Sequence, residues 1–189
     1  MEASPQEFLI TALKRRIADA RHIVVGALSP IPGSAALLAR HESGGRVRVT
    51  IVGSARHTSF TDGGRELFDC AAQGRIDVFF LGGGQIDGAA NVNMTGTGPY
   101  PKSTVRFPGA FGSAYLYYLV PRVYLFREEH SPRTLVEKVD FITAPGASPA
   151  NVYRQGGAVG LWPGVVSPSA NPSIICVGVS HPYCPTAPW

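Results

Sequence analysis

The sequence has few charged residues, few cysteines and no long apolar run, and each shortage excludes a class of protein. Charged residues make up 16% of the 189 positions, against about 25% in an average soluble domain. No apolar stretch approaches the roughly 20 residues that a membrane-spanning helix needs. Lys14, Arg15 and Arg16 interrupt the first amphipathic stretch, and no apolar core with a cleavage site follows them. We therefore expect neither a membrane anchor nor a secretory leader.

Cysteine and histidine are sparse and scattered. Cys70, Cys176 and Cys184 form no CxxC pair, and none of the five histidines has a partner at metal-ligand spacing. This pattern argues against a disulfide framework and against a zinc site, and it favours a reducing cytoplasmic compartment. The sequence also lacks the GxSxG, HExxH, Walker and GxGxxG signatures.

The charge balance is only mildly basic, with a net charge of +4 and no basic run of five or more residues. We therefore expect no nucleic-acid partner. A mild positive excess suits an anionic substrate such as a coenzyme A thioester, although an ordinary solvated surface is the simpler explanation of the charge alone.

Apolar periodicity predicts alternating strands and helices. Helical spacing favours helices over residues 5–17, 34–40 and 62–72, with a short aromatic helix or turn over 113–119. Apolar runs favour strands over residues 22–27, 46–53, 76–81, 123–127 and 136–142. We expect residues 29–33 to form a stiff proline turn and 41–45 a loop. The alternation predicts an α/β fold, an open and mostly parallel sheet with helices on both faces.

Ligands in such sheets bind beyond the carboxyl ends of the strands, so two glycine-rich loops, one after the predicted strand 76–81 and one around Pro108, are the places to look for a site. The first contains Gly83, Gly84, Gln85 and Asp87. Its glycines allow backbone N–H groups to approach a ligand, and its polar side chains add contacts or organise the floor of the site. The alternative is a tight strand exit whose polar side chains cap nearby backbone.

The second loop contains Gly109, Ala110, Phe111 and Gly112. Paired N–H groups in such a loop can hold a thioester oxyanion. The alternative is a glycine and proline loop that packs Phe107 and Phe111 into the core.

The C-terminal part differs in composition. Residues 141–189 contain eight prolines and a single charged residue, Arg154. We predict one α/β domain over residues 1–158 and an irregular proline-rich arm over 159–189 that packs on the same domain. A contribution to a partner interface and a poorly matched terminus remain open for this segment.

Several segments together, in this order, resemble one family. Residues 76–96 and 105–146 resemble the β subunit of heteromeric family I CoA-transferases, such as that of glutaconate CoA-transferase. The similarity lies in Gln85-Ile86-Asp87 followed by Ala90-Asn91-Val92-Asn93, in the Pro108–Gly112 loop, and in the Val136–Gly146 strand. The opening segment, residues 22–40, also fits.

The resemblance implies an open α/β sheet shared with sugar-phosphate isomerases. It implies a partner α subunit, in an α2β2 heterotetramer, with the active site at the subunit interface. It further implies an acyl-CoA substrate, with coenzyme A entering as part of that substrate rather than as a permanent cofactor. In the family, a β-subunit glutamate attacks the thioester, and glycine-rich loops stabilise the oxyanion.

The sequence departs from the family at that glutamate. The family has an E-x-G at the end of the strand after the LAR helix, whereas here the strand ends in Gly53-Ser54-Ala55. Glu42-Ser43-Gly44 matches the E-x-G pattern but precedes the strand. Glu42 is therefore the candidate nucleophile of this chain. The resemblance implies CoA transfer to a carboxylic acid. One alternative is a CoA-dependent hydrolase that opens a steroid-derived ring with a carboxylate on the α subunit. Another is a non-catalytic subunit.

Overall fold

The computed structural model describes residues 4–146, 161–162, 165–166 and 174–179. The larger elements are α1 (Pro5–Ile17), β1 (His22–Val25), α2 (Pro30–Glu42), β2 (Arg48–Ile51), α3 (Gly63–Ala72), β3 (Val78–Leu81), α4 (Ser113–Leu119), β8 (Arg122–Glu129) and β11 (Ile174–Val179). Short paired strands are β4 (Gln85–Ile86) with β5 (Val92–Asn93), β6 (Gly96–Thr97) with β7 (Val105–Arg106), and β9 (Leu161–Trp162) with β10 (Val165–Val166).

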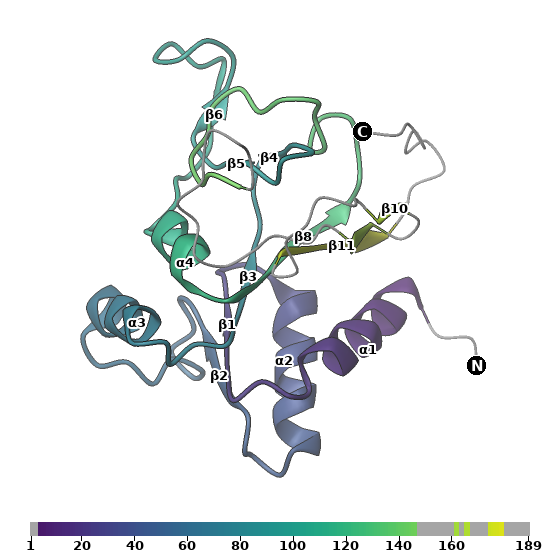
Figure 1. The fold of residues 1–189 in the computed structure, drawn as a ribbon, viewed down its shortest axis with the longest axis vertical. Coiled ribbons are helices and arrows are strands. Elements are labelled where there is room, and N and C mark those ends of the chain that lie inside the picture. Colours follow the sequence, from purple (N-terminus) through teal and green to yellow (C-terminus); the bar gives the residue numbers. More distant parts are fainter. Residues whose placement is uncertain (1–3, 147–160, 163–164, 167–173, 180–189) are drawn as a thin grey trace.

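A five-stranded sheet with the order β11-β8-β3-β1-β2 forms the centre of the molecule (Figure 1). Every neighbouring pair of strands in it is parallel. The central strand β3 pairs with β1 through Val78↔Ile23 and with β8 through Val78↔Arg122. This confirms the predicted open parallel sheet.

Helices cover both faces of this sheet, as predicted. Successive residues of β3 alternate between two apolar clusters: Phe79 packs with α3 and α4, and Phe80 packs with α1 and α2. Figure 1 shows the two helix pairs on opposite sides of the sheet. Because both faces are buried, the strands read as continuous apolar runs rather than as alternating ones.

Helix α1 matches its predicted bounds and shows why that prediction was possible. Ser4 and Glu7 form a capping box, in which each backbone N–H is bound by the other residue's side chain. Leu9, Leu13 and Ile17 then recur on one face and are buried. Caps and a spacing of four residues are local signals that need no tertiary contact.

Helix α2 is longer than the sequence predicted. It begins at Pro30, within the predicted proline turn, and it ends at Glu42, within the predicted loop. Proline fits the first helical turn because the N–H groups there lack intrahelical acceptors. The helix ends in a Schellman motif, in which the N–H of left-handed Gly44 donates to His41 O and the N–H of Gly45 donates to Arg40 O.

The predicted strand over residues 136–142 was wrong. Only isolated bridges flank this segment, between Leu135 and Ile86 and between Ala144 and Val92. The Val136 N–H donates to Ile86 O of β4 at 3.0 Å, and beyond this contact the backbone binds side chains. The Val139 N–H donates to Asp87 Oδ2 at 3.4 Å, and the Asp140 N–H donates to Gln85 Oε1 at 3.0 Å.

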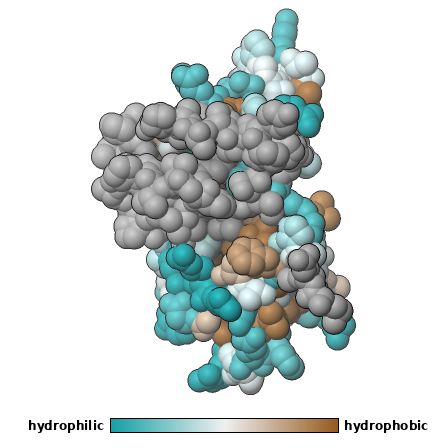
Figure 2. Space-filling model, turned by 90° about the vertical axis from the view of Figure 1, so that its right-hand side faces the viewer, coloured by the Kyte–Doolittle hydropathy of each residue, from teal (hydrophilic) through white to brown (hydrophobic). Residues whose placement is uncertain are grey.

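Part of the segment expected to be an irregular arm is regular. Strand β11 extends the central sheet by pairing with β8, for example Ile175↔Tyr124. The rest of the predicted arm, apart from β9 and β10, lies outside the described residues. Figure 2 shows apolar and polar residues interspersed on the side of the molecule that carries α1. Among the described helices none is long and apolar enough to cross a membrane.

His22 is a buried polar residue at the start of β1. Its Nδ1 lies 3.2 Å from the carbonyl oxygen of Arg75, and its Nε2 lies 2.9 Å from the Oγ1 of Thr50. Burial, together with the positive charge of Arg48, lowers the pKa of His22. The imidazole is therefore neutral in the folded protein at neutral pH. An Nδ1 proton donated to Arg75 O leaves Nε2 to accept from the Thr50 hydroxyl.

We expect His22 to make the protein less stable in mild acid. Its folded-state pKa lies below the ordinary value of about 6.5, so the unfolded chain takes up the proton first. The stabilisation is complete above that ordinary value and declines as the pH falls below it. Urea unfolding at pH 7.5 and 5.5 should show a smaller loss of stability for His22→Gln than for the wild type. His41→Gln, on the surface, serves as control, and an unchanged pH dependence in His22→Gln would contradict the assignment.

Candidate active site

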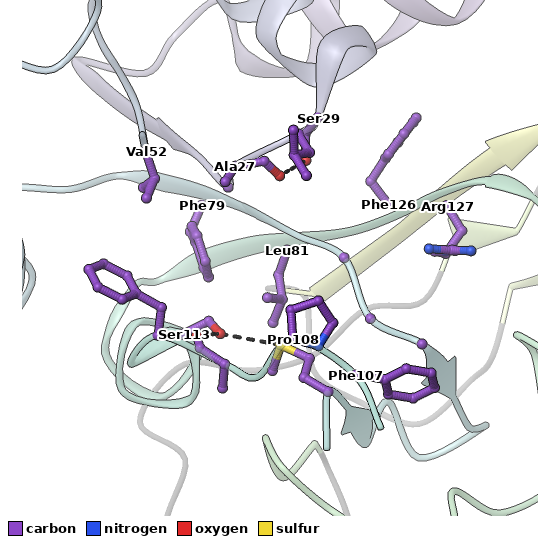
Figure 3. Close-up of a pocket in the computed structure, with 18 of the residues that line it drawn as sticks. Ala27, Ser29, Val52, Phe79, Leu81, Phe107, Pro108, Ser113, Phe126 and Arg127 are labelled. Carbon is purple, nitrogen blue, oxygen red and sulfur yellow. Dashed lines mark hydrogen bonds between the residues drawn. The ribbon is translucent and has the colours of Figure 1, made fainter. Parts of the chain in front are cut away.

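A cavity of about 1170 Å³ opens at the carboxyl ends of the parallel strands (Figure 3). Its walls come from residues 26–29 after β1, 82–84 after β3, 107–111 before α4, and 126–128 at the end of β8. Loops after several parallel strands meet at this edge, and ligands of open α/β sheets bind there. The structure thus brings both predicted glycine loops to one cavity.

The first loop needs glycine because other chain segments approach it closely. A Cβ atom on Gly84 would lie 2.2 Å from the ring of Phe107, and one on Gly83 would lie 2.3 Å from the side chain of Val92. The Gly84 N–H donates to Asn93 O at 2.8 Å. Phe107 therefore packs directly on the loop backbone, and the two glycine loops form one wall of the cavity.

Asp87 lies behind the first loop, outside the cavity lining, and is buried. Its Oδ1 accepts the N–H groups of Ala89 at 3.0 Å and Asn91 at 2.9 Å. Its Oδ2 accepts the Asn91 side-chain amide at 3.0 Å. A buried carboxylate is tolerated because these donors replace its hydration.

Gln85 is also buried behind the loop and absent from the lining. Its Oε1 accepts from the side-chain amide of Asn93 at 2.7 Å and from the Asp140 N–H, and its Nε2 donates to Asp140 Oδ2 at 3.2 Å. Gln85 and Asp87 thus bind backbone and side-chain groups behind the first loop and do not face the cavity.

The second loop is exposed and partly strained. Phe111 has φ +42° and is 70% exposed, although it lines the cavity. Leu28, in the part of the lining that follows β1, has φ +55° and is fully exposed. A positive φ is uncommon in residues other than glycine, and such strain concentrates at functional sites.

The backbone of this second loop offers donors. Gly109 has φ +105° and Gly112 has φ +71°, so both require glycine. The Ser113 hydroxyl donates to Ala110 O. Among the described residues, none accepts a hydrogen bond from the N–H groups of residues 109–112. Gly109, Ala110 and Phe111 line the cavity, and their N–H groups are its candidate oxyanion donors; Gly112 is not among the lining residues.

Three ionisable residues of the lining were not predicted from the sequence. Arg127, Glu128 and His130 all follow the apolar part of β8. Glu128 Oε1 accepts a 3.4 Å hydrogen bond from Gln6 on α1, and His130 is buried. Polar residues at the exit of a predicted apolar strand were the signal that could have identified them.

The structure places Glu42 away from the cavity. Its carboxylate pairs with Lys14 Nζ at 2.6 Å. Glu42 is the last residue of α2, and Pro30, the first residue of the same helix, lines the cavity. A helix rises about 1.5 Å per residue, so Glu42 and Pro30 lie about 18 Å apart along α2. At the exit of β2, Val52 lines the cavity and no carboxylate follows in Gly53-Ser54-Ala55.

The coenzyme A transferase family matches residues 7–159 of this chain. The chain is 40% identical over 82 residues to the β subunit of 3-oxoadipate CoA-transferase from Pseudomonas knackmussii, covering 43% of this chain and 31% of that protein. It is 33% identical over 69 residues to the β subunit of glutaconate CoA-transferase from Acidaminococcus fermentans, covering 36% and 25%. The matches thus span less than a third of these curated relatives.

Among solved structures, the decarboxylase AibA/AibB has a similar fold. The superposition has a TM-score of 0.70 at 20% identity and covers 96% of this chain and 91% of that one. At this level of identity, the likeness concerns the fold alone.

We expect adjacent glycines of the first loop to differ sharply in their tolerance of a methyl group. Gly84→Ala should lower the free energy of unfolding by about 1–3 kcal/mol, because the new Cβ overlaps the Phe107 ring. Gly82→Ala is the matched control: its Cβ would lie 3.5 Å from Phe126 O, an ordinary contact, and should cost less than about 0.5 kcal/mol. Urea unfolding measures both, and equal losses would contradict the packing of Phe107 on Gly84.

Proposed function

Since this chain belongs to the coenzyme A transferase family, we propose that it is the β subunit of a two-subunit enzyme that transfers coenzyme A from an acyl-CoA thioester to a carboxylic acid. The observation that carries this proposal is the cavity between two glycine loops at the carboxyl edge of the sheet. Its partner is an α subunit, in an α2β2 assembly that works in the cytoplasm.

The second glycine loop has the groups that a thioester reaction needs. When a carboxylate attacks the thioester carbonyl, negative charge develops on the carbonyl oxygen before the thiolate leaves. The N–H groups of residues 109–111 bind that oxygen, and one donor of this kind changes the rate by about 10²–10³-fold. The apolar side chains of the lining, which include Phe79, Leu81 and Met94, keep water from the site.

The attacking carboxylate comes from outside this chain. The one carboxylate in the described lining, Glu128, is bound to Gln6, and Glu42 lies at the far end of α2. The exit of β2 offers no acidic residue. The α subunit therefore contributes the nucleophile, and this chain contributes the oxyanion donors.

The missing carboxylate at β2 also supports a second candidate function. A CoA-dependent hydrolase with its carboxylate on the α subunit uses water as acceptor and opens a steroid-derived ring. In both cases acyl-CoA binds at the loops of this chain. A non-catalytic subunit is the third case and predicts that the loops do not affect the rate.

In the first experiment the chain is purified from its host together with any protein that co-purifies. The native mass of the sample and its transfer of CoA from an acyl-CoA to acetate are then measured. A stoichiometric second chain and exchange of coenzyme A are the expected results. Borohydride reduction in the presence of acyl-CoA, followed by peptide mapping, should leave Glu42 unmodified. A trapped adduct on Glu42 would overturn the assignment of the nucleophile to the α subunit.

We expect Gly109→Ala to lower kcat of the complex by about 10²-fold, because its φ of +105° is unfavourable for alanine and the loop must shift. Gly45→Ala is the matched control. Gly45 also has positive φ, +85°, no atom lies within 4 Å of a Cβ at either position, and Gly45 lies outside the cavity. Both variants should lose similar stability. An unchanged kcat in Gly109→Ala would favour the non-catalytic subunit.

A further inference from the structure

Two exposed apolar residues lie on opposite sides of the cavity. Leu28 belongs to the loop after β1 and Phe111 to the loop before α4, and both line the cavity. Figure 3 shows Ala27 and Pro108, which belong to these two loops, on opposite sides of Leu81 in this view. The two exposed side chains therefore come from the two loops that face each other across the cavity.

Both residues have a backbone conformation that costs free energy in the isolated chain. Their φ angles are positive, +55° for Leu28 and +42° for Phe111, which is uncommon for residues other than glycine. Intramolecular packing offsets little of this cost, because Leu28 is fully exposed and Phe111 is 70% exposed. Strained residues of this kind persist where a function requires them. The pair therefore points to a contact with another molecule that covers both side chains.

Phe111 belongs to an ordered aromatic surface. Its ring centroid lies 6.5 Å from that of Phe68 on α3, and Phe68 meets Tyr115 of α4 edge to face at 5.8 Å. Phe68 packs closely on the loop, since a Cβ atom on Gly112 would lie 2.3 Å from its ring. Tyr115 is itself exposed. Aromatic residues that are already ordered lose little side-chain entropy on binding, and they are enriched in protein interfaces.

The segments that carry these residues contain no charge. Residues 23–39 and 107–121 lack Asp, Glu, Lys and Arg. The nucleotide end of coenzyme A carries several negative charges and requires cations, so these segments do not suit it. Charged residues are depleted in the core of protein interfaces, where aromatic residues are enriched. The two loops therefore suit an apolar protein surface.

The chemistry of the proposed site requires a second protein at this position. The attacking carboxylate comes from another chain, and the N–H groups of residues 109–111 lie about 3 Å from the carbonyl oxygen that they bind. The carbon under attack is bonded to that oxygen, so the other chain must bring its carboxylate to the same loop. A chain that reaches this loop meets its exposed side chain, Phe111.

We propose that Leu28 and Phe111 are the two anchors on which the partner α subunit docks through an apolar surface, and that its contact with Phe111 holds the oxyanion loop in its strained conformation. The inference rests on the proposed function, because it takes the N–H groups of residues 109–111 as the oxyanion donors. Phe111 is then a positioning residue that acts through the backbone of its own loop. Assembly of the two chains completes the geometry of the donors.

The test mixes this chain with the α subunit that co-purifies with it, each produced separately, and measures their Kd by calorimetry. Phe111→Ala and Leu28→Ala should each weaken binding about tenfold or more, as interface anchors do. Phe8→Ala is the matched control, because Phe8 on α1 is 72% exposed, lies outside the cavity lining and should leave the Kd unchanged. Urea unfolding should show little loss of stability in any of the three, because each removes an exposed side chain.

Kinetics at saturating α subunit distinguish positioning from docking alone. Phe111→Ala should lower kcat about tenfold and change KM less, because the donors of the loop act on the transition state. Leu28→Ala should reach the wild-type kcat once it is saturated. Phe111→Leu, which keeps an apolar side chain, should recover most of the affinity and of kcat. A wild-type kcat in saturated Phe111→Ala would overturn the positioning role.

The results also separate this inference from the proposed function. If both variants weaken assembly but the wild-type complex transfers no CoA, the proposed function fails and the docking surface stands. If the complex transfers CoA and both variants bind and turn over as the wild type does, the docking surface fails and the proposed function stands. A homodimer of this chain that dissociates in Phe111→Ala would assign the surface to a second copy and overturn the proposal.

Discussion

The buried side chains of Gln85 and Asp87 satisfy backbone groups that no strand of the central sheet can reach. Asp87 accepts N–H groups from its own turn and from residue 139, and Gln85 connects β5 to residue 140. These bonds hold the 131–146 segment against the short strands and leave the glycine loop in one position. Phe107 packs on that loop, and both line the cavity. Without the network, buried polar backbone would be left unpaired at the floor of the site.

Prediction from the sequence succeeded where the signals were local. Helix α1 was found from its cap and its spacing of four, and β3 was found from a run of buried residues bounded by glycines. It failed where distant residues decide the outcome. The apolar residues of 136–142 suggest a strand, but acceptors about 50 residues away bind its N–H groups. Residues 29–33 were predicted as a turn, whereas α2 begins at Pro30. Proline occurs both where helices end and where they begin, and only the packing of the residues that follow distinguishes these two cases.

The candidate site was predictable to the same extent. Both glycine loops were predicted as ligand positions because ligands of open α/β sheets bind beyond the carboxyl ends of the strands, and the structure brings both to one cavity. Arg127 was not identified, because the sequence does not show which strand residues line a cavity, and a register shift between β8 and β11 near this residue interrupts the simple alternation of faces. Glu42 was a candidate only because Glu42-Ser43-Gly44 matches the E-x-G pattern. Helix α2 extends to Glu42, and its length separates this residue from the cavity.

The distribution of charge favours the proposed arrangement, in which this chain supplies the oxyanion donors and the partner chain supplies the nucleophile. A nucleophilic carboxylate of this chain placed beside Arg127 would be stabilised as an ion pair, which lowers both its pKa and its nucleophilicity. The exit of β2 has no acidic residue, and the described lining contains one arginine, Arg127, and one carboxylate, Glu128. In the proposed two-subunit enzyme the nucleophile is present only when the two chains are assembled, so the proposal predicts that the isolated subunit does not consume acyl-CoA.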